Sequence, residues 1–392
     1  MNKKIFISTG EVSGDLHGGL LSKALFDEAR KLSINLEIYG LGGEKMKNQG
    51  VQIFQDTTSI SAIGIWEALP LIIPMMRIQK KFYQSIKKYR PNCLILIDYM
   101  GPNIKIGMKL KKSRSNIPIY YYIAPQEWAW RVGNNSTTNL INFSDKIFAI
   151  FKQEASFYKR RGGNVFWVGH PMIDLTKKLP SKKDSRTILK LRASQNILLL
   201  MPASRPQELR YILPTYLKTA KKLQLRYPSL VIYIPSCRKV FDKKFREGLE
   251  KYKIKGTVIS QKDDSELMPY VYSLTKLALC KSGTVNMELA LYGIPQIVGY
   301  RVSRVTAFIA KKILNFKVKF ISPVNLLLKK SVVPEFVQKN FNENKIFYKA
   351  CRLLDLSSEK ARIKKGYTLL KKELGEEGVV KRAAKEIINS II

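Results

Sequence analysis

Close to its N-terminus the chain reads Gly10-Glu11-Val12-Ser13-Gly14-Asp15-Leu16-His17-Gly18-Gly19, directly after the apolar run Ile5-Phe6-Ile7. This order predicts a buried strand that breaks into a glycine-rich turn and continues as a helix with an apolar face over residues 20–25. Such a turn lets a ligand approach the backbone and directs the N–H groups of the helix towards it. The stretch therefore predicts a strand–helix unit of an α/β sheet with a binding site at its corner.

The glycine spacing excludes the usual dinucleotide-binding turn. The glycines occupy positions 10, 14, 18 and 19, which does not match G-x-G-x-x-G. The turn also contains two carboxylates, Glu11 and Asp15, and a phosphate group is better bound where there are none. We therefore expect this corner to face an acceptor or a sugar rather than a nucleotide phosphate.

The charge of the chain is its one unusual bulk property. The 392 residues include 69 Lys and Arg against 30 Asp and Glu, so the net charge is +39, and the basic residues are spread from Lys3 to Lys385. The excess predicts attraction to nucleic acid, an anionic membrane surface or phosphorylated substrates, although a lysine-rich compositional bias would give the same count. The length favours roughly two or three domains.

Cysteine usage and hydropathy bear on the compartment. The four cysteines form no C-x-x-C pair, and Cys93 and Cys280 stand in apolar runs, so we expect buried free thiols in a reducing cytosol. The N-terminus shows no signal-peptide pattern, and no apolar run reaches the ~18–20 residues of a transmembrane helix. We expect a soluble protein that at most rests on a membrane surface.

Short apolar runs alternate with helical patterns in both halves of the chain, as a parallel α/β sheet requires. Strands are expected at residues 5–7, 36–39, 51–54, 92–98, 119–123, 146–150, 165–168, 196–201, 230–234, 257–260, 277–281 and 297–300. Helices are expected at residues 208–226, 240–253 and 306–314, and only helices after about residue 342. This pattern predicts the α/β class, with two Rossmann-like domains facing a cleft and ligands beyond the carboxyl ends of the strands.

The domain boundaries follow from a polar, lysine-rich stretch at residues 175–192, which we interpret as the linker. We expect an N-terminal domain over residues 1–176, which contains the glycine-rich corner, and a C-terminal domain over residues 186–341. Residues 342–392 are expected to be C-terminal helices that pack back on the N-terminal domain.

An apolar segment between residues 63 and 82 interrupts the alternation. It contains Pro70 and Pro74, which make it a poor core helix, and a basic cluster over residues 80–90 follows it. This combination is typical of an interfacial anchor or a pocket for acyl chains, and a pair of ordinary core helices is the alternative. The side chains expected to make this contact are Ile65, Trp66, Leu69, Leu71, Ile72, Ile73, Met75 and Met76.

Two strand-to-helix corners in the second half suit a diphosphate. One contains Pro202-Ala203-Ser204-Arg205, whose arginine can pair with phosphate oxygens. The other is Ser282-Gly283-Thr284, which offers a hydroxyl group and the N-terminus of a helix. Glu288 lies one helical turn further on and could accept both hydroxyls of a ribose. Helix capping would explain each corner alone, but their combination in one half favours a binding site.

Taken together, the motifs resemble the lipid-A-disaccharide synthase family of inverting glycosyltransferases, with matches from Gly10 to about Gln338. The matching runs are Gly10–Asp15, Gly64–Glu67, Ile97-Asp98, Trp128–Arg131, Val168–Pro171, Ser204-Arg205 with Glu208, Ser282–Thr284 with Glu288, Asn325, and Pro334-Glu335 with Gln338. The resemblance implies the two-domain GT-B fold without a catalytic metal or other cofactor. It also implies transfer of 2,3-diacylglucosamine from UDP-2,3-diacylglucosamine to 2,3-diacylglucosamine 1-phosphate, which forms a β-1,6 linkage and releases UDP.

The resemblance makes Asp98 the candidate general base that removes the proton of the acceptor 6-hydroxyl. His17 is the rival base, whereas we interpret His170 as a structural hydrogen-bond partner. The residues implied on the acceptor side are Glu11, Ser13, Asp15 and His17. Those implied at the donor site are Arg205, Ser282, Gly283, Thr284, Glu288, Asn325 and Gln338.

This chain departs from the family pattern in places. After the base it reads Tyr99-Met100-Gly101-Pro102-Asn103, where the family usually has a second acidic residue and Phe-Asn. Ala203 stands where the family has glycine, so the turn there needs no positive φ.

Two other functions are compatible with parts of the sequence. A nonhydrolysing UDP-sugar epimerase would share the two-domain architecture but would leave the apolar segment unexplained. A basic nucleic-acid-binding protein would explain the charge, but the chain has no recognised binding motif. We therefore expect the two acylated sugars and an anionic membrane surface as partners, no nucleic acid, and a homodimer as an open question. The expected location is the cytoplasmic face of the inner membrane in a Gram-negative-type bacterium.

Overall fold

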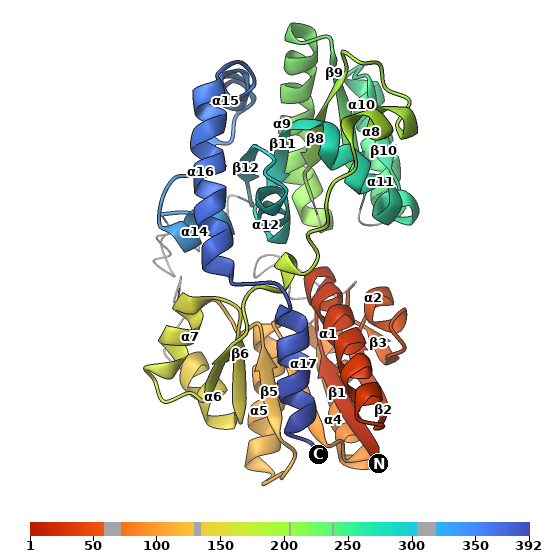
Figure 1. The fold of residues 1–392 in the computed structure, drawn as a ribbon, viewed down its shortest axis with the longest axis vertical. Coiled ribbons are helices and arrows are strands. Elements are labelled where there is room, and N and C mark those ends of the chain that lie inside the picture. Colours follow the sequence, from red (N-terminus) through yellow and green to blue (C-terminus); the bar gives the residue numbers. More distant parts are fainter. Residues whose placement is uncertain (59–71, 129–134, 204, 237–238, 304–318) are drawn as a thin grey trace. The chain divides into compact units, whose positions relative to one another are not determined.

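The computed structural model of the chain describes residues 1–58, 72–128, 135–203, 205–236, 239–303 and 319–392. The chain divides into two compact units, of which the first comprises Met1–Leu175 with Glu373–Ile392 and the second comprises Thr176–Lys372. Each unit is built on one parallel β-sheet with helices on its faces (Figure 1). The predicted α/β class with two Rossmann-like sheets is confirmed.

The sheet of the first unit has the strand order β3-β2-β1-β4-β5-β6-β7, and its neighbouring strands are parallel. Its strands are β1 (Asn2–Ser8), β2 (Asn35–Gly42), β3 (Gln52–Asp56), β4 (Cys93–Ile97), β5 (Ile119–Tyr122), β6 (Lys146–Ala149) and β7 (Val165–Trp167). Its helices are α1 (Val12–Lys31), α2 (Glu44–Lys47), α4 (Ile72–Tyr89), α5 (Met100–Lys112), α6 (Asn135–Phe143), α7 (Lys152–Lys159), the 3₁₀ turn η2 (Pro171–Ile173) and α17 (Val379–Asn389).

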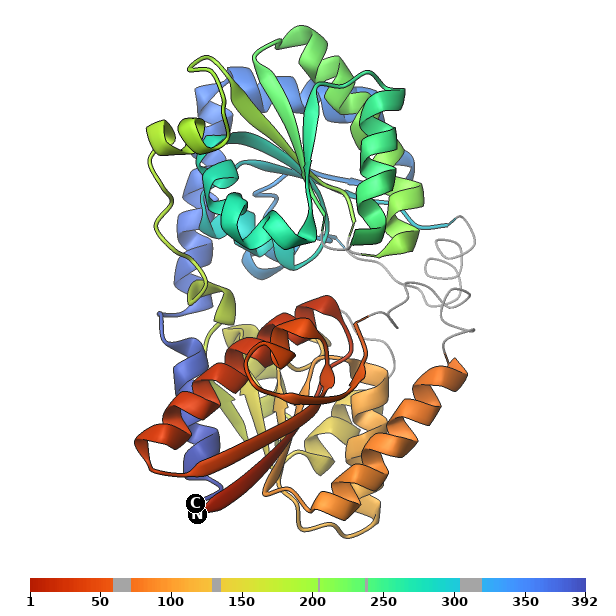
Figure 2. The same cartoon turned by 90° about the vertical axis from the view of Figure 1, so that its right-hand side faces the viewer.

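Helices cover both faces of this sheet, with α1 and α17 on one face and α4 and α5 on the other (Figure 2). Alternation along the central strands provides the two faces, since successive side chains of a strand point to opposite sides. Phe6 of β1 and Leu94 of β4 belong to the same buried cluster as Phe82 of α4. Ile5 and Ile95, which point to the opposite face, are also fully buried, so the core lies on both sides of β1 and β4.

The C-terminal helix α17 is part of the first unit. It packs along α1 (Figures 1 and 2), and both chain termini lie together because the Lys3 ammonium group donates to the carbonyl of Ile391. Its start is held by Asp174, whose carboxylate accepts the N–H groups of Gly378 and Val380 at 2.7 and 2.8 Å. Such an N-terminal carboxylate satisfies helix N–H groups that have no partner within the helix.

The sheet of the second unit has the order β10-β9-β8-β11-β12-β13 and is also parallel. Its strands are β8 (Asn196–Met201), β9 (Leu230–Pro235), β10 (Gly256–Ile259), β11 (Thr275–Lys281), β12 (Gln296–Tyr300) and β13 (Glu335–Val337). Its helices are α8 (Lys182–Ile188), α9 (Pro206–Arg226), α10 (Lys239–Lys251), α11 (Gln261–Leu274), α12 (Thr284–Leu291), α14 (Pro323–Leu328), the 3₁₀ turn η4 (Gln338–Asn340), α15 (Glu343–Asp355) and α16 (Ser357–Leu374).

The structure corrects two details of the sequence analysis. The expected linker contains helix α8, which begins where the Ser181 hydroxyl accepts the N–H of Asp184 at 3.1 Å. The sequence did not predict this helix, because it is rich in lysine and a polar helix has no apolar periodicity. Strand β13 was not expected, because three residues are too short for an alternating pattern. The helix expected at residues 306–314 lies outside the described residues.

Within the part of the chain that the structure describes, no helix combines the length and the apolar character needed to cross a bilayer.

Gly18 and Gly19 are required by the packing of α1 on α2. A Cβ atom on Gly19 would lie 2.8 Å from the carbonyl oxygen of Lys45, and one on Gly18 would lie 2.6 Å from Sδ of Met46. Two of the glycines that indicated a binding turn therefore allow two helices to approach closely.

We predict that Gly19→Ala lowers the free energy of unfolding by about 1–3 kcal/mol, because backbone must move to admit the methyl group. Urea unfolding of the purified protein measures the effect. The control is Gly101→Ala on α5, where an added Cβ meets nothing within 4 Å and alanine favours the helix. A Gly19→Ala protein as stable as the control variant would contradict this explanation.

Candidate functional site

One candidate site lies in the first unit, at the carboxyl ends of β1 and β4. These strands are paired in parallel with Ser8 opposite Leu96, so the turns that follow them lie side by side. The ring of Tyr99 occupies the space beside Gly10, where an added Cβ would lie 2.0 Å from Cδ2 of the ring. Gly10 is therefore the residue that lets the Asp98–Tyr99 turn rest on the turn before α1.

Asp98, the candidate base, directly follows β4 and is half-buried. Its backbone has φ 48° and that of Tyr99 has φ 49°, a left-handed conformation that L-residues with side chains rarely adopt. Most other non-glycine residues with a positive φ in the described part of the chain, such as Arg90 and Lys253, lie at helix ends. Asp98 and Tyr99 differ because they are consecutive and follow a strand, and strained turns of this kind occur at functional sites. The unusual backbone supports the assignment of Asp98 to the chemistry.

Glu11 and Tyr99 form the border of this corner. Burial and the negative charge of Glu11 raise the pKa of Tyr99 to about 12, so its hydroxyl group is protonated at neutral pH. Glu11 is the N-cap residue of α1, and Ser13 lies half-buried in the first turn of that helix. Both residues therefore lie on the same edge of the sheet as Asp98.

Asp15 has a structural role that its sequence position did not indicate. Its carboxylate is buried and accepts the backbone N–H groups of Gly43, Lys45 and Met46 at 2.7, 3.0 and 3.1 Å. These bonds hold the start of α2 against α1. Of the acceptor-side candidates, Asp15 is therefore already engaged by the protein's own backbone.

The two histidines, which lie far apart in the sequence, are neighbours in the fold. The rings of His17 and His170 are 6.3 Å apart between centroids, and both side chains are buried. Nδ1 of His170 accepts the N–H of Met172 at 3.2 Å, which confirms its structural role as a hydrogen-bond partner. Nδ1 of His17 is buried and has no hydrogen-bond partner among the described residues. Burial lowers the pKa of His17 to about 4, so this imidazole is neutral at physiological pH.

Another candidate site lies in the second unit, at the carboxyl ends of β8 and β11, which are neighbours in the second sheet. Arg205 is the N-cap residue of α9, and its backbone N–H donates to Oε2 of Glu208 at 3.0 Å. The other oxygen of Glu208 forms a buried ion pair with Nζ of Lys281 at 3.1 Å. Glu208 therefore ties the two corners together, and Lys281 is a cation of the site that sequence reasoning missed.

The Ser282–Thr284 corner rests on a buried polar network. Gly283 donates its N–H to Oδ1 of Asn286 at 2.9 Å, and Nδ2 of Asn286 donates to the carbonyl of Lys281 at 3.0 Å. The hydroxyl group of Ser282 donates to the carbonyl of Ile321 at 2.6 Å and keeps its lone pairs for other donors. Thr284 begins α12, whose first N–H groups have no acceptor within the helix.

Asn325 contributes to the donor side indirectly. It is fully buried, and its amide bonds the N–H groups of Val332 and Val333 as well as the carboxylate of Glu335. Glu335 in turn accepts the N–H of Ile321, whose carbonyl receives the Ser282 hydroxyl. Asn325 therefore holds the segment that supports the serine corner.

Gln338 and Glu288 complete the expected donor set. Gln338 follows β13 and has the left-handed φ of 51°, and its carbonyl accepts from the guanidinium group of Arg301 at 3.1 Å. Glu288 lies half-buried on α12. Burial of Tyr292 raises the pKa of that tyrosine, and the negative charge of Glu288 raises it further. Arg301, like Lys281, is a cation at this edge that the sequence analysis did not include.

Five of the eight side chains expected to make the membrane or acyl-chain contact lie outside the described part of the structure, namely those of Ile65, Trp66, Leu69, Leu71 and Ile72. Of the others, Ile73 is 63% and Met76 is 58% exposed on α4, and Met75 is half-buried. The exposed cations Arg77, Lys80 and Lys81 follow on the same helix. The start of α4 therefore presents apolar side chains next to positive charge.

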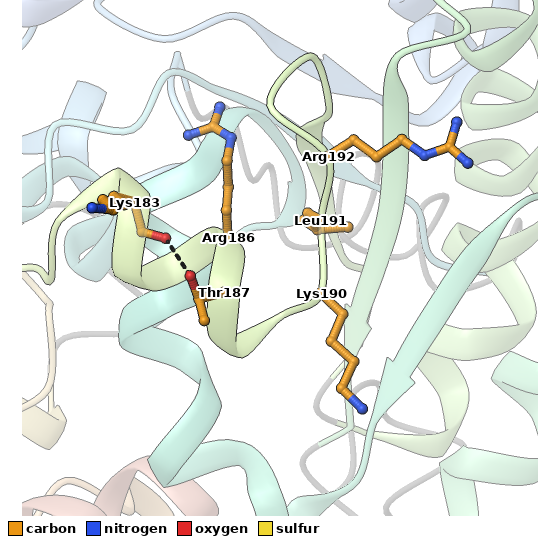
Figure 3. A pocket seen from close by; sticks show the side chains of 6 residues that line it. All are labelled: Lys183, Arg186, Thr187, Lys190, Leu191 and Arg192. Carbon is orange, nitrogen blue, oxygen red and sulfur yellow. Dashed lines mark hydrogen bonds between the residues drawn. The ribbon is translucent and has the colours of Figure 1, made fainter.

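A surface hollow of the second unit lies elsewhere. Its volume is about 390 Å³, and Figure 3 shows its lining residues, which are Lys183, Arg186, Thr187, Lys190, Leu191 and Arg192. They belong to α8 and to the turn that leads to the amino end of β8, whereas Arg205 follows the carboxyl end of that strand. The hollow is therefore not part of the candidate site.

Among the described residues, no group of three or more His, Cys, Asp and Glu side chains could hold a metal ion.

The buried histidines predict a pH dependence of stability. The chain contains two histidines, and burial lowers the pKa of both, that of His17 to about 4 and that of His170 to about 3. Below about pH 6.5 the unfolded state takes up protons that the folded state does not, so stability is lost as the pH falls towards the folded values. We predict that urea unfolding from pH 7 to about pH 4.5 shows this loss, and that His17→Gln reduces it by up to about 3 kcal/mol.

The control for this experiment is Lys23→Gln, an exposed substitution on the same helix. It should keep the wild-type pH dependence. An equal loss of stability in the wild-type and His17→Gln proteins would show that His17 does not titrate in this way.

Comparison with known proteins identifies the family. A family model described as lipid-A-disaccharide synthetase matches residues 5–391. The lipid-A-disaccharide synthase of Prochlorococcus marinus (strain MIT 9313) is 48% identical over 98% of this chain and 98% of its own length. That of Gloeothece citriformis (strain PCC 7424) is 40% identical over 99% of this chain and 100% of its own length.

Solved structures show the same fold at low identity. The S. aureus MnaA–UDP co-structure has a TM-score of 0.65 at 15% identity and covers 100% of this chain and 98% of its own. MurG of Acinetobacter baumannii has a TM-score of 0.54 at 13% identity, with 99% of each chain covered. The expected GT-B architecture is confirmed, and at these identities the likeness extends to the fold alone. The chain belongs to the lipid-A-disaccharide synthase family, as its motifs predicted, and is a glycosyltransferase.

Proposed function

We propose that this protein transfers 2,3-diacylglucosamine from UDP-2,3-diacylglucosamine to the 6-hydroxyl of 2,3-diacylglucosamine 1-phosphate. The products are the β-1,6-linked disaccharide 1-phosphate and UDP. The observation that supports this best is the Asp98 turn, because it combines a family motif with a backbone conformation typical of functional sites. The relatives named lipid-A-disaccharide synthase support the reaction and its substrates.

In this proposal the first unit binds the acceptor and Asp98 is the base. Its carboxylate accepts the proton of the acceptor hydroxyl as the oxygen attacks the anomeric carbon from the face opposite UDP. Attack from that face inverts the configuration at the anomeric carbon. Glu11, Ser13 and the protonated hydroxyl of Tyr99 are available to bind acceptor hydroxyls along the same edge.

The second unit would bind UDP. Negative charge develops on the β-phosphate as the bond to the sugar breaks, and fixed positive groups stabilise it. Arg205, Ser282 and the first N–H groups of α12 follow neighbouring strands and suit this role, and Lys281 adds a further cation. Glu288 would bind the ribose. Gln338 would help to shape the donor pocket, to which Asn325 would contribute through the segment that it holds.

The base assignment is tested by comparing Asp98→Ala and His17→Ala in an assay with both acylated sugars. General-base catalysis typically contributes about 10²–10⁴-fold, so we predict that Asp98→Ala loses at least about 100-fold in kcat. We expect His17→Ala to keep most of its activity, because His17 is buried and its pKa is low. Full activity of Asp98→Ala with loss in His17→Ala would reverse the assignment.

We further propose that the start of α4 contacts the anionic membrane surface that holds these lipid substrates. Exposed Ile73 and Met76 could insert among the headgroups, while Arg77, Lys80 and Lys81 attract the negative surface. This proposal also supports a location at the cytoplasmic face of a bacterial inner membrane.

Sedimentation with vesicles that contain phosphatidylglycerol measures this contact. The double variant Ile73→Ser/Met76→Ser should bind the vesicles roughly tenfold more weakly, since it has lost two apolar side chains whose transfer from water into the membrane favours binding. The control is Leu225→Ser, because Leu225 of α9 is equally apolar and 70% exposed. Equal binding of the double variant and the control would exclude this contact.

A further inference from the structure

The left-handed turn at Asp98 needs a structure that holds it. Asp98 and Tyr99 are consecutive residues with φ values of 48° and 49°, and neither is a glycine. This backbone conformation has a higher free energy than the usual ones for a residue with a side chain. A turn with two such residues therefore relaxes unless surrounding groups hold it. The groups that hold this turn come from α5 and β5.

Asn103 provides the first set of contacts. It lies on α5, is fully buried, and donates from Nδ2 to the carbonyl oxygens of Asp98 and Ile97 at 2.9 and 3.2 Å. The same Nδ2 lies 3.3 Å from the carbonyl oxygen of Ser8, and Oδ1 of Asn103 accepts the Ser8 hydroxyl at 2.7 Å. One amide thus connects the end of β1, the end of β4 and the Asp98 turn.

Tyr121 provides an independent contact from β5. Its hydroxyl group donates to the carbonyl oxygen of Asp98 at 2.7 Å, and its side chain is fully buried. Burial raises the pKa of Tyr121 well above its usual value, so the hydroxyl group remains a donor at all physiological pH values. The Asp98 carbonyl therefore accepts from two buried side chains that come from different elements.

We propose that Asn103 and Tyr121 are positioning residues, which hold the carbonyl of Asp98 and so fix the turn that presents its carboxylate. This proposal rests on the proposed function, in which Asp98 is the base. Neither residue needs to touch a substrate, because both act through the backbone of Asp98. Removing either contact lets the turn relax and moves the carboxylate away from its working position, which lowers kcat.

The clearest test is Tyr121→Phe, because it removes one hydroxyl group and leaves the ring in place. Asn103→Ala also leaves the Ser8 hydroxyl without its acceptor and is more prone to misfold. The matched control is Tyr158→Phe. Tyr158 is equally buried in the same unit, and its hydroxyl group donates to the carbonyl of Pro125 at 2.9 Å rather than to Asp98.

We predict that Tyr121→Phe lowers kcat about tenfold, which corresponds to the loss of one hydrogen bond, and leaves the KM for the UDP-sugar within about twofold. Tyr158→Phe should keep the wild-type kcat at a similar cost in thermal stability. In the Asp98→Ala background, Tyr121→Phe should cause no further loss of residual activity, because it acts through Asp98. A merely structural role would lower the residual activity again.

The outcomes separate this proposal from the one on which it depends. If Asp98→Ala is fully active, the base assignment is wrong, whatever Tyr121→Phe does. If Asp98→Ala is inactive while Tyr121→Phe has the same kcat as Tyr158→Phe, Asp98 remains the base and the positioning role is excluded. An additive effect of Tyr121→Phe in the Asp98→Ala background also excludes it.

Discussion

The parallel pairing of β1 with β4 is the constraint on which the Asp98 turn depends. It places the turn after Ser8 beside the turn after Ile97, and the amide of Asn103 bonds both strand ends. The ring of Tyr99 then lies against Gly10, so the two turns pack directly on each other. The absence of a side chain at Gly10 and the buried amide of Asn103 thereby help to fix one carboxylate at the edge of the sheet.

The candidate site of the second unit follows the same principle with different chemistry. Strand pairing brings the corners after β8 and β11 together, and buried polar groups underneath hold their backbones. The ion pair between Glu208 and Lys281 connects the two corners directly. In both units, residues that look catalytic by type, such as Asp15 and Asn325, use all or most of their hydrogen-bonding atoms to support the loops.

Much of the fold could be predicted from the sequence, because apolar runs of five or six residues between helical patterns are strong signals of buried parallel strands. The strands around Ile95 and Leu199 are examples. The lysine-rich helix α8 and the short strand β13 were missed because neither has an apolar period. At the site, motif resemblance indicated Asp98, but its contact with Tyr121, 23 residues away, requires the three-dimensional structure. The glycine-rich turn was only partly a ligand signal, since Gly18 and Gly19 are required by the contact between α1 and α2.

In the proposed reaction this chain forms a glycosidic bond with inversion at the anomeric carbon. The most direct measurement is an incubation of the wild-type protein with UDP-2,3-diacylglucosamine and 2,3-diacylglucosamine 1-phosphate, followed by NMR of the isolated lipid. We expect a disaccharide whose new anomeric centre is β and the release of one UDP for each bond formed. An α-linked product, or a UDP-sugar that is epimerised without transfer, would contradict it.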